Sequence, residues 1–171
     1  MKLPPTNNER TFSEDEIIVS KTDLSGHITY ANRVFLDVAL YTESEVLGSP
    51  HSLVRHPEMP RSIFILLWDT IQEKHEIFAY VKNMAKNGDF YWVFAHVTPS
   101  YAANGEITGF HSNRRLPRRD AIEKVDSLYR ELLAEENKHD DRKQGMNAGY
   151  DKLVALLKDS GTSYDEFVHS L

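Results

Sequence analysis

The residues with the clearest potential for chemistry lie in two short stretches of the chain. Arg55 and His56 stand directly before Pro57-Glu58-Met59-Pro60, and Asn83 lies within a run of strand-forming residues. A guanidinium can bind phosphate oxygens through two parallel N–H bonds, and an imidazole or an amide can both donate and accept hydrogen bonds. Asparagine is depleted in strands, so Asn83 indicates a polar role in a site. Taken alone, Arg55 is better explained as a solvated loop arginine and His56 as a loop residue.

Aromatic and amide side chains elsewhere add further candidates for a ligand site. Trp68 and Trp92 can stack on a planar ligand, although tryptophans at helix and strand positions more often belong to the core. Asn32 can contribute an amide to a site, or it can serve as the N-cap of a short helix. Pro60 suits the first position of a helix, where no N–H is needed. The N-terminus of that helix, which attracts anions, therefore lies close to Arg55 in the sequence.

The elements that must position these residues follow from hydrophobic periodicity and turn signals. Helices are expected after Asn32, after Thr42 in a T-x-x-E capping box, and from Pro60 to Lys74. Asn87-Gly88 and Asn104-Gly105 favour type I′ hairpin turns between the later strands. The expected strands cover residues 17–22, 27–30, 78–83, 90–99 and 107–114. We therefore predict an α+β fold, with a five-stranded antiparallel sheet, short helices over one face, and a concave gap between the two layers.

Residues 116–171 predict helices that follow the sheet. Ile122, Val125, Tyr129 and Leu132 form an apolar stripe at helical spacing. This stripe can pack back on the exposed face of the sheet, or it can form a contact with a second copy or a partner. Both alternatives are consistent with the sequence.

Four arginines crowd the start of the first of these helices: Arg114, Arg115, Arg118 and Arg119. Positive charge at a helix N-terminus opposes the helix dipole, so these side chains do not serve helix stability. A solvated junction is the simpler explanation, and an acidic partner surface is the alternative.

Composition excludes several classes of protein. The chain has 171 residues, 40% of them hydrophobic, which suits one globular domain with additional elements. A formal net charge of -6 argues against nucleic-acid binding, because phosphate affinity depends on clustered Lys and Arg. No run approaches the length of a membrane span, and the first residues do not form a signal peptide. The absence of cysteine excludes a disulfide framework and favours a cytoplasmic location.

Sequence signatures of catalysis are also missing. No G-x-G-x-x-G follows a strand, no H-E-x-x-H or cysteine ligand set is present, and no nucleophile–base constellation is visible. We therefore do not expect an enzyme. His51, His96 and His111 can each offer an imidazole, which leaves heme open as a ligand.

Four segments together resemble one branch of a known family. They read TDLSGHITYAN, GSPHSLVRHPEMP, VKNMAKNGDFYWVFAHVTP and GEITGFHSNR, in that order. The order of elements resembles that of PAS domains, and the segments are similar to the flavin-binding PAS domain of bacterial aerotaxis receptors over roughly residues 13–115. The N-G-D-x-Y-W-V piece occurs across PAS domains, whereas R-H-P-x-M-P together with V-K-N is much more selective. Two positions depart from that pattern, because Glu58 replaces the usual Asp, and Ile77, with Phe78 next to it, replaces a usual Trp.

The resemblance implies a PAS fold that binds FAD noncovalently, senses redox state or oxygen-linked electron flow, and passes the signal to a chemoreceptor module. Arg55 and the helix N–H groups after Pro60 would then meet the pyrophosphate, and the amide of Asn83 would face the polar edge of the flavin ring. Blue-light LOV domains are also flavin PAS domains, but their thiol adduct cannot form in a chain without cysteine. The implied cofactor site comprises Asn32, Arg55, His56, Phe64, Trp68 and Asn83, and we add Trp92 as a further lining residue.

We predict a flexible lead-in at residues 1–11, a PAS sensor domain at residues 12–115 and a helical C-terminal extension at residues 116–171. The protein is expected to be a stand-alone cytoplasmic redox sensor that signals to a chemoreceptor or another signalling protein, with a homodimer as a further option. Neither nucleic-acid binding nor membrane insertion is expected. Reduction of the flavin would reorient Asn83 and shift hydrogen bonds through the strands toward the arginine-rich junction. The alternatives are a PAS module that binds heme or a small metabolite, and an interaction module without a cofactor.

Overall fold

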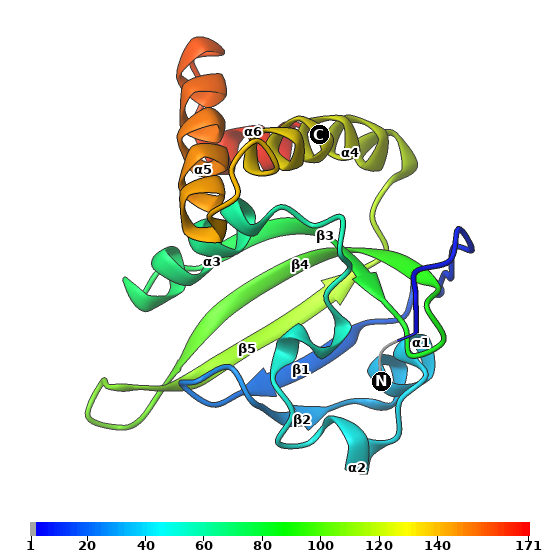
Figure 1. Cartoon of the computed structure of the whole chain (residues 1–171). Helices are drawn as coiled ribbons and strands as arrows, with labels where there is room; N and C mark the ends of the chain where they lie inside the picture. Colours follow the sequence, from blue (N-terminus) through cyan, green and yellow to red (C-terminus); the bar gives the residue numbers. More distant parts are fainter. Residues whose placement is uncertain (1–2) are drawn as a thin grey trace.

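The centre of the protein is a five-stranded antiparallel sheet with the strand order β2-β1-β5-β4-β3 (Figure 1). A computed structural model describes residues 3–171. The N-terminal hairpin joins the three later strands through the pairing of β1 with β5, in which Ile18 lies opposite Arg114 and Thr22 opposite Phe110. The predicted antiparallel α+β fold is confirmed. The strands are β1 (Ile18–Thr22), β2 (Ile28–Ala31), β3 (Ile77–Met84), β4 (Phe90–Tyr101) and β5 (Ile107–Arg115).

Helices cover both faces of this sheet. The segment between β2 and β3 forms α1 (Arg33–Ala39), α2 (Glu43–Val46), the short 3-10 helix η1 (His51–Val54) and α3 (Arg61–Gln72). After β5 come α4 (Arg119–Glu136), α5 (Arg142–Asp159) and α6 (Tyr164–Ser170). Figure 1 shows α1 and α2 on one side of the sheet and α4 and α6 on the other, with α5 standing across the end of α4. No helix within residues 3–171 combines the length and the apolar character that a membrane crossing requires.

Local capping explains where the short helices begin. The side chain of Asn32 accepts a hydrogen bond from the N–H of Phe35 at 3.0 Å, so Asn32 is the N-cap of α1 as the sequence predicted. Thr42 and Glu45 form the predicted capping box at the start of α2. Both arrangements satisfy N–H groups that the first helical turn leaves without a partner.

The Asn-Gly turns differ from the predicted type. A type I′ turn needs positive φ at both central residues, but among residues 3–171 the only non-glycine residues with positive φ are Leu40 and Lys74. In the turn between β3 and β4, Gly88 has a φ of 93° and its N–H donates to the carbonyl of Ala85 at 3.0 Å. A type I turn followed by a glycine in the left-handed region therefore connects these strands.

The alternation of side chains along β4 separates two environments. Ala95 and Val97 point to the face covered by α3, whereas Trp92 points to the face covered by α4. On that second face the hydroxyl of Tyr129 donates to the carbonyl of Tyr80 at 2.6 Å, and its ring stacks on Trp92 with 6.3 Å between centroids. The apolar stripe of α4 therefore packs back on the sheet, which is the first of the two alternatives considered above.

Of the expected flexible lead-in, residues 3–11 are tied to the turn between β3 and β4, and residues 1–2 lie outside the described part of the chain. The N–H of Thr6 donates to the carbonyl of Gly88 at 2.8 Å, and the N–H of Arg10 donates to the carbonyl of Phe90 at 2.7 Å. The side chain of Phe12 is buried in the core. Backbone pairing and one buried ring thus hold this segment against the domain.

Candidate functional site

A cavity of about 290 Å³ lies between α3 and the inner face of the sheet. Its volume is close to the lower end of the range of about 300–1,000 Å³ that is typical of small-molecule sites. Leu67 and Ile71 of α3 face Val81 and Ala95 of the sheet across this space, so most of its wall is apolar. The cavity can therefore enclose a flat, largely apolar ring.

One end of the cavity holds a buried polar cluster. Nη2 of Arg114 donates to Oγ of Ser20 at 2.8 Å and to Nε2 of His51 at 2.6 Å. Because a guanidinium only donates, Nε2 of His51 is the acceptor, which assigns the ring proton to Nδ1. Burial first and the charge of Arg114 second lower the pKa of His51 to about 3. His51 is therefore neutral at physiological pH.

Two donors at this end of the cavity are left over. Nη1 of Arg114 and Oγ of Ser112 are buried and have no hydrogen-bond partner among residues 3–171. Burial lowers the pKa of Arg114 to about 10, so the guanidinium still carries its charge at neutral pH. No Asp or Glu is among the residues that line the cavity. Since a buried charge without full compensation is costly, this end favours a ligand that presents acceptors or negative charge.

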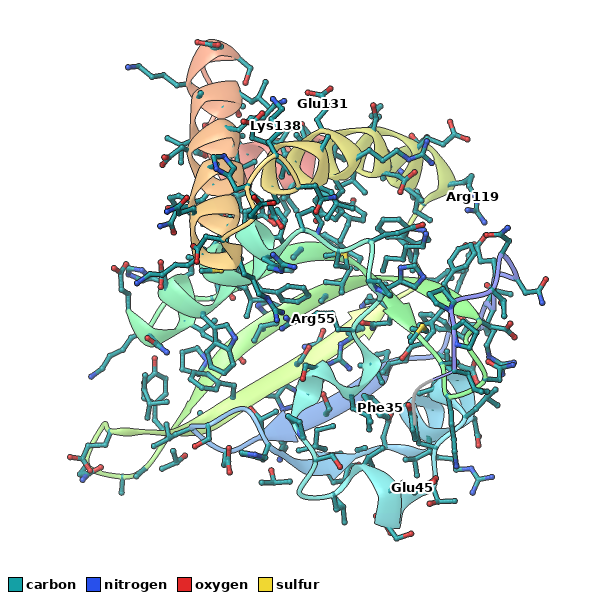
Figure 2. All side chains as sticks on the ribbon, viewed as in Figure 1. Phe35, Glu45, Arg55, Arg119, Glu131 and Lys138 are labelled. Carbon is teal, nitrogen blue, oxygen red and sulfur yellow. The ribbon has the colours of Figure 1, made fainter. Side chains whose placement is uncertain are left out.

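A second guanidinium belongs to the 50–55 loop. Figure 2 shows the side chain of Arg55 between α3 and the strands. Its guanidinium lies 3.8 Å from the ring centroid of Phe64, a cation–π contact that fixes its direction. Arg55 and Asn83 also form an isolated antiparallel backbone bridge, which attaches the loop to β3. Burial, followed by the charges of Arg142 and Arg61, lowers the pKa of Arg55. The charges of Arg61 and Arg142 are therefore close enough to act on Arg55, although neither residue lines the cavity.

The N-terminus of α3 is not directed at the cavity, which corrects the sequence prediction. The N–H groups of Arg61 and Ser62 donate to the carboxylate of Glu136, at 3.1 Å and 2.9 Å. These donors, together with the positive end of the helix dipole, are thus already engaged by an acid from α4. The prediction that the helix N–H groups after Pro60 meet a pyrophosphate is therefore wrong for these two groups, whereas the role of Arg55 stays a prediction.

The structure brings together Arg55, Phe64, Trp68 and Asn83, which all line the cavity. Trp68 forms an edge-to-face contact with Phe110, with 5.5 Å between ring centroids. Asn83 is 4% exposed on the inner face of β3, so its amide is a buried donor and acceptor at the wall. These four side chains are therefore placed to contact one enclosed ligand.

Three predicted residues, Asn32, His56 and Trp92, do not line the cavity. The amide of Asn32 is used within the fold, since it accepts from the N–H of Val19 at 3.0 Å and caps α1. His56 is buried beside Phe90, with 6.2 Å between the ring centroids. Trp92 was expected at the cavity, but strand alternation places it on the opposite face of the sheet.

The two departures from the family pattern, at Glu58 and Ile77, lie in different surroundings. Glu58 forms an ion pair with Lys82 of β3. The ring of Phe78 stacks on His96, with 4.2 Å between centroids, beneath His169 of α6. Glu58 and Phe78 therefore do not line the cavity, whereas Ile77 packs with Ile71, Val97 and Phe110 of its wall.

The polar cluster at the inner end was not predicted from the sequence. Arg114 was expected at a solvated junction, whereas this residue is 4% exposed and lines the cavity. The signal was the spacing of Phe110, Ser112 and Arg114, because residues two apart on a strand share one face. The junction itself holds Arg118 and Arg119, which pair with Asp120 and Glu9.

Acidification is expected to reduce stability through His51. Its folded-state pKa of about 3 lies below the value of 6.5 for an unperturbed imidazole. Between these two values the imidazole is protonated in the unfolded state but not in the folded state. The stability that depends on neutral His51 is therefore fully present above pH 6.5 and is lost as the pH falls from 6.5 toward 3. The expected slope is at most about 1.4 kcal/mol per pH unit. Urea unfolding at several pH values in this window measures it.

A matched pair of variants isolates this contribution. His51→Gln keeps an acceptor for Arg114 but removes the titrating ring, so its free energy of unfolding should vary less with pH. His75→Gln, at an exposed position after α3, is the control and should retain the slope of the original protein. Identical slopes in all three proteins would contradict the assignment.

Comparison with known proteins adds a family match and several relatives. A model described as the PAS fold matches residues 28–114. The chain is 39% identical over 129 residues to the aerotaxis receptor of Escherichia coli (strain K12), which covers 75% of this chain and 25% of the receptor. It is 27% identical over 99 residues to the nitrogen fixation regulatory protein of Klebsiella pneumoniae, with coverage of 58% and 20%. The chain thus spans about a quarter or less of the length of these relatives.

Solved structures agree with the fold. The PAS domain of a Colwellia psychrerythraea protein superimposes with a TM-score of 0.55 and 19% identity, covering 59% of this chain and 86% of that one. A light-oxygen-voltage domain studied with a flavin analogue gives a TM-score of 0.57 and 19% identity, covering 72% and 87%. At these identities the likeness concerns architecture alone.

Proposed function

The chain belongs to the PAS fold family, and from this premise we propose that it binds FAD noncovalently and reports redox state or oxygen-linked electron flow to a signalling partner. One observation carries the proposal. Apolar and aromatic walls enclose a space at whose buried end Arg114 and Ser112 offer donors that no group among residues 3–171 accepts. An isoalloxazine ring has the matching form, because its faces are apolar and its pyrimidine edge carries acceptors.

The residues divide into three roles around such a ring. Arg114 and Ser112 donate to the acceptor edge, and the amide of Asn83 both donates and accepts beside it. Trp68 and Phe64 cover the apolar part of the ring. The cavity volume of about 290 Å³ suits the ring alone, so the remainder of FAD must continue toward the half-buried Arg55, which we assign to the diphosphate.

A bound flavin would supply an electron-accepting ring whose hydrogen-bonding edge changes on reduction. The response of the protein then falls to Asn83 and Arg114, whose side chains must adjust their hydrogen bonds to that edge. Arg114 lies at the end of β5, only a few residues before α4 begins at Arg119. A change at this end of the cavity can therefore reach the C-terminal helices, which we propose as the contact with a chemoreceptor or another signalling protein.

Two other functions are less well supported. Heme would need an axial imidazole, but His51 is the one histidine among the lining residues and its Nε2 is bonded to Arg114 and Ser20. Ser20 and His51 do have the contact of a nucleophile–base pair, at 3.1 Å. With a pKa of about 3, however, His51 is a weak base at neutral pH, so this pair does not suit catalysis.

The visible spectrum of the purified protein tests the proposal. We expect a yellow preparation with the absorption bands of oxidised flavin, and release of FAD on denaturation, identified by chromatography against FMN. Arg55→Ala and Asn83→Ala should each weaken FAD binding about tenfold, since each removes a hydrogen-bonding partner of the cofactor. Arg33→Ala is the control, because Arg33 is exposed and pairs with Asp37 away from the cavity. A colourless protein that takes up no added FAD would refute the proposal, and a red, Soret-dominated sample would support heme.

A further inference from the structure

Glu136, the last residue of α4, is a buried acid that the proposed function does not use. Glu136 is only 2% exposed. Its carboxylate accepts three hydrogen bonds from α3: from the N–H of Arg61 at 3.1 Å, from the N–H of Ser62 at 2.9 Å and from Oγ of Ser62 at 2.8 Å. The C-terminal helices thus provide the cap for the helix that forms one wall of the cavity.

Two glycines of α5 make room for this carboxylate. A Cβ at Gly149 would lie 2.7 Å from Cγ and 2.9 Å from Oε1 of Glu136. A Cβ at Gly145 would lie 2.3 Å from the main-chain oxygen of Glu136. Glycine lowers helix stability, so its presence at both positions of α5 is explained by the close packing of α5 on Glu136.

The capped end of α3 is close to the cavity along the helix. Ser62 precedes Phe64 by two residues, and Leu67 and Trp68 follow one turn later. Phe64, Leu67 and Trp68 line the cavity. A helix moves as a rigid element over such a short distance, so displacement of its first turn displaces these side chains. The three bonds to Glu136 therefore fix the position of the wall relative to α4 and α5.

We propose that Glu136 is a positioning residue of the cavity, and that it couples occupancy of the cavity to the docking of α4 and α5. The coupling rests on the proposed function only for the identity of the ligand. Coupling between two sites is reciprocal. A ligand that is bound against α3 stabilises the contact with Glu136, and loss of that contact lowers the affinity for the ligand. The C-terminal helices α4 and α5 therefore help to hold the cavity wall in place.

Hydrogen exchange tests the positioning without any ligand. Glu136→Gln should lower the protection of the Arg61 and Ser62 amides about ten- to a hundredfold, because a charged acceptor is replaced by a neutral one. Protection should also fall over residues 64–68, which include the cavity-lining Phe64, Leu67 and Trp68. Glu123→Gln is the control, since Glu123 lies on the same helix and is exposed. A loss confined to residues 61–62, with residues 64–68 unchanged, would overturn the proposal.

A double-mutant cycle tests the coupling to ligand binding. Gly149→Ala alone should weaken FAD binding about fivefold or more, because the new methyl group displaces the carboxylate. Combined with Glu136→Ala it should cause little further loss, since the two closest contacts are gone and the remaining one, Oγ of Ser62 at 3.1 Å, belongs to a small side chain that can rotate. Gly145→Ala should lower the affinity for FAD whether residue 136 is Glu or Ala, because the new methyl group meets the main-chain oxygen of residue 136.

The outcomes separate the two proposals. If the original protein binds no FAD, the proposed function fails and the exchange data alone decide on the positioning role of Glu136. If FAD binds with equal affinity to the original protein and to the Glu136→Gln variant, Glu136 is a structural cap only and the coupling is refuted.

Discussion

Replacement of Arg114 by methionine is expected to weaken FAD binding strongly while leaving the ligand-free protein as stable as before or more stable. The two effects have one cause. Arg114 is 4% exposed and keeps Nη1 without a partner among residues 3–171, so the ligand-free fold bears a buried charge that is only partly compensated. A bound flavin would provide the missing acceptor. The same guanidinium therefore costs stability in one state and provides affinity in the other.

The neighbours of Arg114 tolerate its removal. Oγ of Ser20 and Nε2 of His51 lie 3.1 Å apart, so the hydroxyl can donate to the imidazole once the guanidinium is gone. Methionine fills a similar length with an apolar chain beside Phe35, over whose ring Arg114 now lies at 5.7 Å. Replacing buried charged groups with apolar ones often stabilises a protein by about 1–4 kcal/mol. We expect a gain of about 1–2 kcal/mol in the free energy of unfolding.

The loss of affinity should be about ten- to a hundredfold, because a charge-assisted hydrogen bond to the ligand disappears. FAD titration gives the affinity, and urea unfolding of the ligand-free protein gives the stability. Arg115→Met is the matched control, since Arg115 is the next residue on β5 and is exposed. A fall in stability that accounts for the loss of binding would show Arg114 to be a structural residue and contradict the prediction.

Local signals in the sequence were sufficient for the elements of the fold. The cap at Asn32 and the capping box at Thr42 involve groups three residues apart, so the chain itself brings them together. The Asn-Gly pairs identified the turns correctly but not their type. The type depends on how many residues the flanking strands leave unpaired, and in the β3–β4 turn the N–H of Ala85 bonds to the carbonyl of Asp89 at 2.7 Å.

The candidate site was only partly accessible from the sequence, and the reasons are physical. The predictions for Arg114 and Trp92 were wrong, although strand alternation determines the face on which each side chain lies. Arg114 lies on the same face as Ser112, and Trp92 lies on the face opposite to Ala95. The contact of Glu136 with Ser62 is different in kind. It joins residues 74 positions apart, and nothing in the periodicity of α4 indicates that its last acid reaches another helix.

The two tryptophans are expected to give opposite results when each is replaced by leucine. Trp68 lines the cavity and Trp92 does not. Trp68→Leu should weaken FAD binding about three- to tenfold through the loss of an aromatic contact worth about 0.5–1.5 kcal/mol. Its effect on stability should be smaller than that of Trp92→Leu, because Trp68 is half-buried whereas Trp92 is 5% exposed.

Trp92→Leu should instead lower the free energy of unfolding by about 2–3 kcal/mol, since truncation of a buried tryptophan to alanine costs about 3–5 kcal/mol. The ring stacks on Tyr129 of α4, so its removal should weaken the packing of the C-terminal helices on the sheet. FAD titration well below the unfolding transition separates affinity from stability. Equal loss of affinity in both variants would mean that the ligand senses the α4 face of the sheet as strongly as its own cavity wall. In that case the route from cavity to C-terminal helices would run through the sheet and not through the cap on α3.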